Sequence, residues 1–195
     1  MLRSMIISAM FALTAQPVLA GEAAEEVIET AAEQLSAGAF DGAALVETLS
    51  VDGIARFTLG KYARRLDAEE LDRFTTAFEL FLIETFDAES ERFEGAEIIV
   101  EGSHDRNERD SIVLTEVRLP GAEPLDVRWR LIERNGEWRA VDVEIQGLWL
   151  AVEQRAQIVA ILGETGATVS DAIDALGVDE SVKYARLDNK RTSRR

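Results

Sequence analysis

Histidine is the side chain most often used for proton transfer near neutral pH, and the chain has a single one, His104. It lies in the stretch Ser103-His104-Asp105-Arg106-Asn107, whose composition predicts a charged turn between two strands. A serine–histidine–aspartate triad needs a histidine held rigidly beside the nucleophile, so we favour an exposed histidine without a catalytic role. The chain has no cysteine, which excludes thiolate nucleophiles, disulfides and cysteine-bound zinc or iron–sulfur clusters.

Carboxylates are the other groups that could carry out acid–base chemistry. A buried aspartate in a pocket between sheet and helices could act as a general base, and the candidates are Asp110, Asp126 and Asp142. Asp142 alternates with apolar neighbours, which favours a side chain that faces water. The acids between Asp87 and Glu94 indicate a solvated helix end rather than a metal cage. No phosphate-loop, dinucleotide, zinc-protease or calcium-loop spacing occurs, so we expect neither a metal nor a cofactor.

Apolar surface is what the sequence offers in quantity, with three tryptophans, eight phenylalanines and β-branched strand faces. Such a set could line a cavity for an apolar ligand. It could equally pack on itself, and the pattern alone favours that solid core.

Helices are predicted in the first part of the chain and strands in the second. Apolar residues recur at helical spacing in 22–36, 40–49 and 52–59, and again after the acidic capping box Asp67-Ala68-Glu69-Glu70. The helix after this box carries Phe74, Phe78, Phe81 and Phe86, so it should cover a large apolar face. Alternation of period two then predicts strands at 97–101, 111–119, 125–134 and 137–146, the last two joined by an Asn135-Gly136 hairpin turn.

Two helical stretches, 148–162 and 170–176, follow the strands, so the sequence predicts an α+β domain. We expect N-terminal helices packed on a curved antiparallel sheet of about four strands, with the aromatic helix lying across the apolar face and the C-terminal helices closing the domain.

Charge divides the 195 residues into three parts. The whole chain has 37 acidic and 21 basic residues, a formal charge of −16. The last part, 183–195, carries +5 and has no apolar periodicity, so we expect a disordered tail that either touches anionic headgroups or is inert. Since Arg3 adds one more positive charge, 21–182 carries −22, which argues against binding nucleic acid.

Residues 1–20 have the pattern of a secretory signal peptide. Arg3 precedes the apolar run Met5–Leu13, and Val18-Leu19-Ala20 ends the segment with small residues. The run is too short to span a bilayer, so we predict cleavage after Ala20 and a mature protein outside the cytoplasm. The predicted organisation is therefore a signal peptide at 1–20, one α+β domain at 21–182 and the basic tail at 183–195.

Two groups of motifs occur in a definite order along the chain. The first group is Val51–Tyr62 (VDGIARFTLGKY), Leu66–Phe74 (LDAEELDRF) and the pair Ala77-Phe78. The second is Trp129-Arg130-Leu131, Asn135–Val143 (NGEWRAVDV) and Glu144–Gly147 (EIQG). Together they resemble the MlaC, or toluene-tolerance, family, and their order and spacing are more specific than any one of them. The chain departs from the family pattern at Val141, where an aromatic residue is common, and at Leu148-Trp149, where an aliphatic residue and a serine are usual.

The resemblance implies a nuclear-transport-factor-like α+β fold and a periplasmic carrier of phospholipid. It implies that acyl chains lie in an apolar pocket between sheet and helices, and that the carrier moves lipid between an outer-membrane lipoprotein complex and an inner-membrane ABC transporter ring. Such a carrier, a component of a lipid-transport system for the outer membrane, needs no cofactor or catalytic residue. Alternation and the resemblance together predict these lining residues: Phe74, Phe78, Leu82, Val113, Val117, Trp129, Leu131, Val143, Ile145 and Trp149.

Two other functions remain open at this point. The first is a small isomerase- or dehydratase-like enzyme on the same fold, which would use one of the three aspartates as a buried base. The second is a structural adaptor of the cell envelope with a solid core and no ligand.

Overall fold

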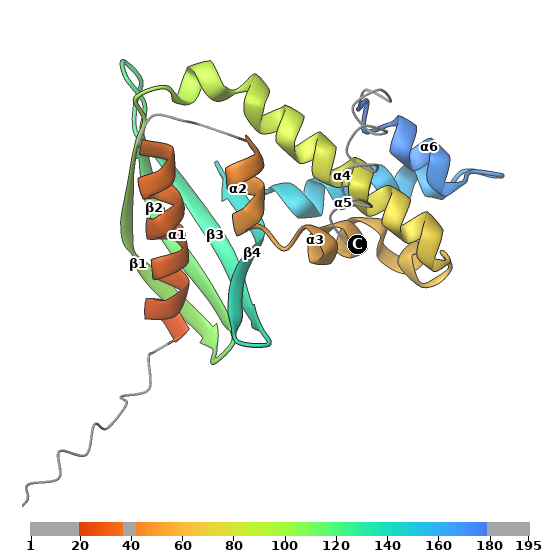
Figure 1. Cartoon of the computed structure of the whole chain (residues 1–195), viewed down its shortest axis with the longest axis horizontal. Coiled ribbons are helices and arrows are strands. Elements are labelled where there is room, and N and C mark those ends of the chain that lie inside the picture. Colours follow the sequence, from red (N-terminus) through yellow and green to blue (C-terminus); the bar gives the residue numbers. More distant parts are fainter. Residues whose placement is uncertain (1–19, 37–41, 179–195) are drawn as a thin grey trace, which may run out of the picture.

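The computed structural model describes residues 20–36 and 42–178 (Figure 1). The predicted signal peptide, apart from Ala20, and the predicted basic tail at 183–195 lie outside these residues. The chain forms an α+β fold in which helices come first, an antiparallel sheet follows and two further helices end the described part.

Four helices precede the sheet: α1 (Ala20–Ser36), α2 (Gly42–Thr48), α3 (Val51–Leu59) and α4 (Ala68–Ala88), with a 3-10 turn, η1 (Gly60–Arg64), before α4. The predicted capping box is confirmed at the start of α4. Asp67 Oδ1 accepts from the backbone N–H of Glu70, and Glu70 Oε2 accepts from that of Asp67. Gly60 ends α3 with φ +58°, a conformation that glycine adopts at little cost.

Five strands in sequential order form the sheet: β1 (Glu97–Asn107), β2 (Asp110–Arg118), β3 (Leu125–Arg134), β4 (Glu137–Ile145) and β5 (Leu148–Trp149). A second 3-10 turn, η2 (Ser90–Phe93), leads into β1. The turn Asn135-Gly136 joins β3 to β4, with φ values of +56° and +84°. These positive values are those of the predicted hairpin turn. The two-residue strand β5 was not predicted.

The predicted turn around His104 is wrong. Residues 103–107 belong to β1, and His104 is exposed opposite Ile112 of β2. The tight connection between the two strands lies further on, where Asn107 Oδ1 accepts from the backbone N–H of Arg109. The side chain of Asn107 thus stabilises the turn that brings β2 back along β1.

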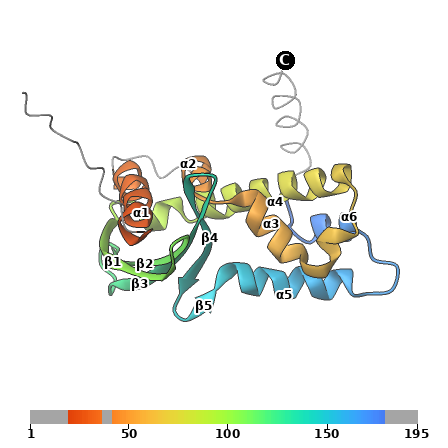
Figure 2. The same ribbon diagram turned by 90° about the horizontal axis from the view of Figure 1, so that it is seen from below.

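α1, rather than the aromatic helix α4, is the helix that lies directly on the strands. α1 packs along β1 and β2 and buries Ala24 and Ile28 against the sheet (Figure 1). α4 runs past α1 and packs mainly on α2, α3 and α6 (Figure 2). It reaches the sheet through its large side chains, because Phe74 and Phe78 belong to the same buried cluster as Val113 of β2.

After the sheet come α5 (Leu150–Leu162) and α6 (Val169–Asp174). β5 turns directly into α5 at one end of the sheet, and α5 extends away from α1 along α3 (Figure 2). α6 begins with a capping box between Thr168 and Asp171 and packs on α4 and α5. The molecule therefore has a part built on the sheet and a part built on helices, and α4 contributes to both. In the described residues no helix combines the length and apolarity that a membrane crossing requires.

Candidate functional site

Alternate residues of the strands form two faces of opposite character. The inner face is turned toward α1 and carries Ser111, Val113, Thr115 and Val117 of β2, with Val127, Trp129 and Leu131 opposite them on β3. The outer face carries charged side chains between a few aliphatic ones. The register therefore fixes which of the predicted site residues could meet an apolar ligand.

Six of the ten predicted lining residues come together at the inner face. Phe74, Phe78, Val113 and Leu131 are buried in one cluster, and Leu82 and Trp129 pack against it half-buried. The rings of Phe74 and Phe78 stack with centroids 6.0 Å apart. The exposed fractions of Phe74, Val113 and Leu131 are 0%, so no water-sized sphere reaches them from outside or from an internal void. This part of the interface is closed.

The other four predicted residues lie outside that cluster. Val117 is buried elsewhere on the inner face, and Val143 and Ile145 are half-buried in register with Trp129 and Val127. Trp149 is half-buried opposite Glu144 of the outer face, whereas its neighbour Leu148 lies opposite Ile145. Leu148, rather than Trp149, therefore continues the inner face, and 60% of its surface is exposed.

Phe81 and Phe86 of α4 also pack half-buried against the cluster, although neither is among the predicted lining residues. The ring centroid of Phe81 lies 5.8 Å from that of Phe78. Both residues belong to the aromatic series that marked this helix in the sequence, so the signal was present. The closed cluster is thus bordered by half-buried apolar side chains from α4 and from the sheet.

Two hydroxyl groups on the inner face differ in how they are satisfied. Thr115 is buried, donates to the backbone oxygen of Val127 (3.1 Å) and accepts from Nε1 of Trp129 (3.0 Å). Ser111 is buried four residues earlier on the same strand, and its Oγ has no hydrogen-bond partner in the described part of the chain. Thr115 orients the tryptophan, whereas Ser111 leaves a polar atom unpaired in an apolar layer.

The candidate aspartates all lie on the outer face, away from the apolar cluster. Asp110 is opposite Ile132, Asp126 opposite Glu116 and Asp142 opposite Arg130. Asp126 is exposed. A base serving an apolar pocket must reach into that pocket, and the register turns all three carboxylates the other way.

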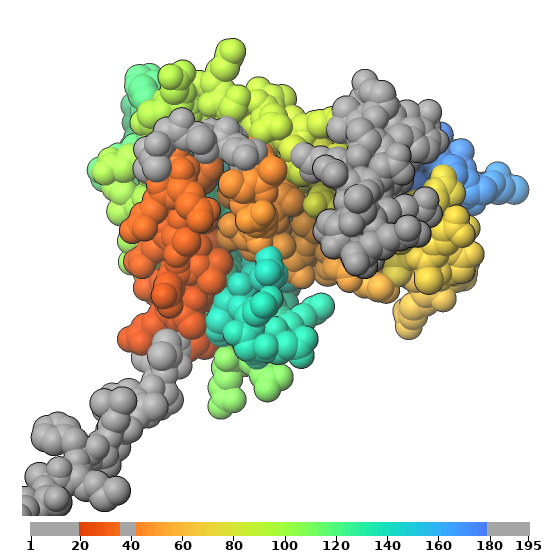
Figure 3. Space-filling view, in the orientation of Figure 1, coloured from red at the N-terminus to blue at the C-terminus, as the bar shows by residue number. Residues whose placement is uncertain are grey.

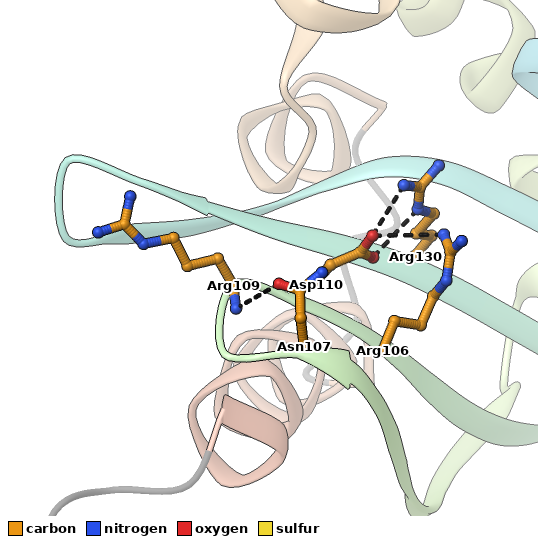
Figure 4. Close-up of polar contacts among 5 residues, drawn as sticks. All are labelled: Arg106, Asn107, Arg109, Asp110 and Arg130. Atoms are coloured by element: carbon orange, nitrogen blue, oxygen red, sulfur yellow. Dashed lines mark hydrogen bonds and ion pairs between the residues drawn. The ribbon is translucent and has the colours of Figure 1, made fainter.

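Asp110 is held ionised by two arginines (Figure 4). Its carboxylate accepts from Nε (3.1 Å) and Nη2 (2.8 Å) of Arg130, and from Nη1 of Arg106 (3.3 Å). The hydrogen bonds from Arg130 are the main reason that the pKa of Asp110 is lowered, and burial opposes them. A carboxyl group with a lowered pKa is a weak base, so this arrangement stabilises the sheet and is unsuited to proton abstraction.

Asp142 has the opposite electrostatic character. It is almost buried, and this burial raises its pKa, while hydrogen bonds from the backbone N–H groups of Ala151 and Val143 oppose the rise. Both N–H groups donate to the same oxygen, Oδ1, at 2.8 and 2.9 Å. The carboxylate thus connects β4 with the first turn of α5. The sequence pattern, which placed Asp142 in water, was wrong for this residue.

A groove lies between α1 and α2 on the helical side of the molecule, where the two helices run side by side (Figure 3). It is open to solvent, has a volume of about 350 Å³ and is lined by Glu26, Val27, Thr30, Ala31, Gln34, Ala44, Glu47 and Thr48. Its lining mixes polar and apolar groups in similar measure, unlike the apolar cluster below it. Across the described residues no group of three histidine, aspartate or glutamate side chains is placed to hold a metal ion.

Comparison with protein families gives a match to the MlaC protein family over residues 31–177. The chain belongs to the MlaC family. The matched range includes all ten predicted lining residues and both motif groups seen in the sequence. No curated protein is similar enough to this MlaC family member to count as a match.

A solved structure shares the fold of this MlaC chain. It is the phospholipid-binding protein from Ralstonia solanacearum, determined in complex with a phospholipid. The two are 19% identical, the TM-score is 0.63, and the match covers 85% of this chain and 94% of the other. The predicted α+β class and the helices packed on an antiparallel sheet are confirmed, with the short β5 added to the expected strands.

Proposed function

We propose that this protein is a periplasmic phospholipid carrier that holds acyl chains between α4 and the inner face of the sheet. The observation that carries the proposal is the meeting of apolar side chains from these two elements in one cluster with a half-buried border. Membership of the MlaC family and the fold shared with a phospholipid-bound protein support it.

The closed cluster and its border have different parts in the proposed site. Phe74, Val113 and Leu131 are in full contact with their neighbours, so they form the floor against which a ligand rests. Phe81, Phe86, Trp129, Val143 and Ile145 retain some exposure, and an acyl chain that covers them removes apolar surface from water. We infer that lipid enters along this border and that the helices move apart to admit it.

Physical chemistry explains why a carrier is needed and why it needs no reaction. Exposing one methylene group to water costs about 0.8 kcal/mol, so two long acyl chains cost on the order of 20 kcal/mol unprotected. Binding between α4 and the sheet offsets most of that cost without making or breaking a covalent bond. We therefore assign no catalytic residue and no cofactor.

The proposed route follows from the family. We propose that the carrier receives and delivers lipid at an outer-membrane lipoprotein complex and an inner-membrane ABC transporter ring, where ATP is hydrolysed by another subunit. The formal charge of −22 on residues 21–182 makes nucleic acid an unsuitable partner.

Mass spectrometry of the protein purified from a periplasm without detergent tests the proposal. We expect stoichiometric phospholipid in the native spectrum and in an organic extract. Val143→Asp places a charge on the inner border, and we expect it to lower the bound phospholipid about tenfold or more, because a carboxylate is costly to bury without a partner.

The matched control is Leu114→Asp, since Leu114 is also half-buried and aliphatic but lies on the outer face. It should leave the bound phospholipid unchanged. Circular dichroism must show that both variants are folded, and Ile145→Asp repeats the test if Val143→Asp does not fold. A well-folded wild-type protein that carries no lipid contradicts the proposed function. Equal lipid loss in the inner and outer variants contradicts the assigned face.

A further inference from the structure

A single carboxylate oxygen closes the segment from β4 to α5 into a loop. Oδ1 of Asp142 accepts from the backbone N–H of Ala151, nine residues later, at 2.8 Å. The same oxygen accepts from the N–H of Val143 at 2.9 Å, which fixes the carboxylate over its own strand. The loop between these bonds contains the turn at Gln146-Gly147, the strand β5 and the start of α5.

α5 depends on this oxygen for its first turn. The first N–H groups of a helix have no partner within it, and a side chain at the residue before the helix usually satisfies one of them. In α5 that residue is Trp149, which provides no such hydrogen bond. Asp142 replaces it from the neighbouring strand and places a negative charge at the positive end of the helix dipole.

The charges around Asp142 hold it in that position. Arg130 lies opposite on β3 and attracts the carboxylate, and Arg130 is itself held by its two hydrogen bonds to Asp110. Glu144, two residues along β4, repels Asp142, but Glu144 is paired with Arg128 at 3.3 Å. Asp142 is only 8% exposed, so water does not compete effectively for Oδ1.

The loop carries part of the border of the proposed lipid site. Val143 and Ile145 lie on its first arm, and Leu148 lies opposite Ile145 on its second. In the first turn of α5, Leu150 and Val152 are 44% and 51% exposed, and Ala151 is the residue that packs into the core cluster. The hydrogen bond to Asp142 therefore joins the burial of the small Ala151 side chain and the short β4–β5 pairing in attaching this turn to the sheet.

We propose that Asp142 is a positioning residue that fastens β5 and the first turn of α5 to the sheet, and thereby controls how slowly bound phospholipid is released. This inference rests on the proposed function. In this proposal the carboxylate of Asp142 does not contact the acyl chains. It acts on them indirectly, by holding the backbone of α5.

Two variants at this position separate the hydrogen bond from the charge. Asp142→Ala removes the acceptor, so we expect the Ala151 amide to exchange its hydrogen about tenfold faster. Asp142→Asn retains a carbonyl oxygen that can accept the same bond, so exchange should stay close to the wild-type rate. Asp126→Ala is the matched control, because Asp126 is an exposed aspartate on the same outer face.

Release of phospholipid is measured on the same proteins by transfer of a fluorescent phosphatidylethanolamine to neutral vesicles. We expect Asp142→Ala to release it about threefold to tenfold faster than wild type, and Asp142→Asn and Asp126→Ala to match wild type. Both variants remove the negative charge, but only Asp142→Asn keeps the acceptor. A wild-type release rate in Asp142→Asn would therefore show that the hydrogen bond, rather than the charge, slows release. If Asp142→Ala does not fold, Asp142→Glu moves the carboxylate by one methylene group and takes its place.

The outcomes distinguish the inference from the function on which it rests. Unchanged Ala151 exchange in Asp142→Ala overturns the role of Asp142 in holding α5. Faster exchange with unchanged release overturns its control of lipid, while leaving the carrier function intact. A wild-type protein that binds no phospholipid contradicts the carrier function and with it the control of release, and the exchange measurement then decides the attachment of α5 by itself.

Discussion

The two faces of the sheet are built from the same strands but are stabilised by different interactions. The inner face is covered by α1 and by aromatic side chains of α4, and it buries Val113, Val127 and Leu131 almost completely. The outer face carries pairs of opposite charge, such as Arg130 with Asp110 and Arg128 with Glu144. Burial makes the inner face sensitive to the size of each side chain, whereas solvent screens the pairs on the outer face.

The largest difference in stability between the two faces should come from truncating a buried leucine. Leu131→Ala removes a side chain with no exposed surface, so we expect the free energy of unfolding to fall by about 2–5 kcal/mol. Leu114→Ala on the outer face is the matched control and should cost about 1 kcal/mol or less, because Leu114 is only half-buried. Denaturant unfolding measures both, and equal losses would mean that the two faces are packed alike.

The two hydroxyl groups of the inner face should respond in opposite ways. Thr115→Val leaves the Nε1–H of Trp129 without its partner, so we expect a loss of about 1–3 kcal/mol in the free energy of unfolding. Ser111→Ala removes an unpaired buried oxygen and should be neutral or stabilising. The same unfolding experiment, with tryptophan fluorescence as the probe, compares them. A destabilised Ser111→Ala would indicate that the hydroxyl has a partner, such as a bound water.

The two buried aspartates of the outer face should give the smallest effects, with opposite dependence on pH. The pKa of Asp110 is lowered, so its contribution is present above about pH 4 and is lost as the pH falls toward the folded pKa. Asp110→Asn should therefore lower the free energy of unfolding by about 1 kcal/mol at neutral pH. The effect is this small because the arginine partners are partly exposed and solvent screens the ion pairs. Its difference from wild type should shrink in acid.

The pKa of Asp142 is raised, so the sign reverses. Its contribution is complete below about pH 4 and is lost as the pH rises through the folded pKa. Asp142→Asn should match wild type in acid and be as stable or slightly more stable at neutral pH. Thermal unfolding of wild type and both asparagine variants from pH 3 to pH 7 tests these two predictions. If the stability difference from wild type changed with pH in the same way for both variants, the two carboxylates would share one environment.

Local patterns in the sequence predicted the parts of the fold that depend on near neighbours. The capping box at Asp67 and Glu70, the Asn135-Gly136 turn and the alternation along β3 and β4 each involve residues a few positions apart. The inward residues of the strands could be identified for the same reason, because alternation assigns a face once one member is known to be buried.

The parts that were missed depend on contacts between distant segments. The role of Asp142 in capping α5 follows from a turn that folds β5 back on β4, and two residues of strand are too few to give a period. α4 has the stronger aromatic stripe, yet α1 lies on the sheet, because small residues such as Gly21 and Ala24 allow close approach whereas phenylalanine rings hold a helix at a distance. Periodicity finds an apolar face but does not say which partner covers it.

The outermost strands of the sheet bear on how the protein behaves at high concentration. β1 has register irregularities between Val100 and Gly102 and between Asp105 and Asn107. At the other margin the two-residue β5 covers one end of β4, and a bridge from Leu49 to Ala140 interrupts the rest. An unpaired strand edge invites a second chain to add by backbone hydrogen bonding, and interruption or brevity of the edge prevents a continuous ladder. Both margins of this sheet are therefore poor templates for the addition of a second chain as a continuous strand.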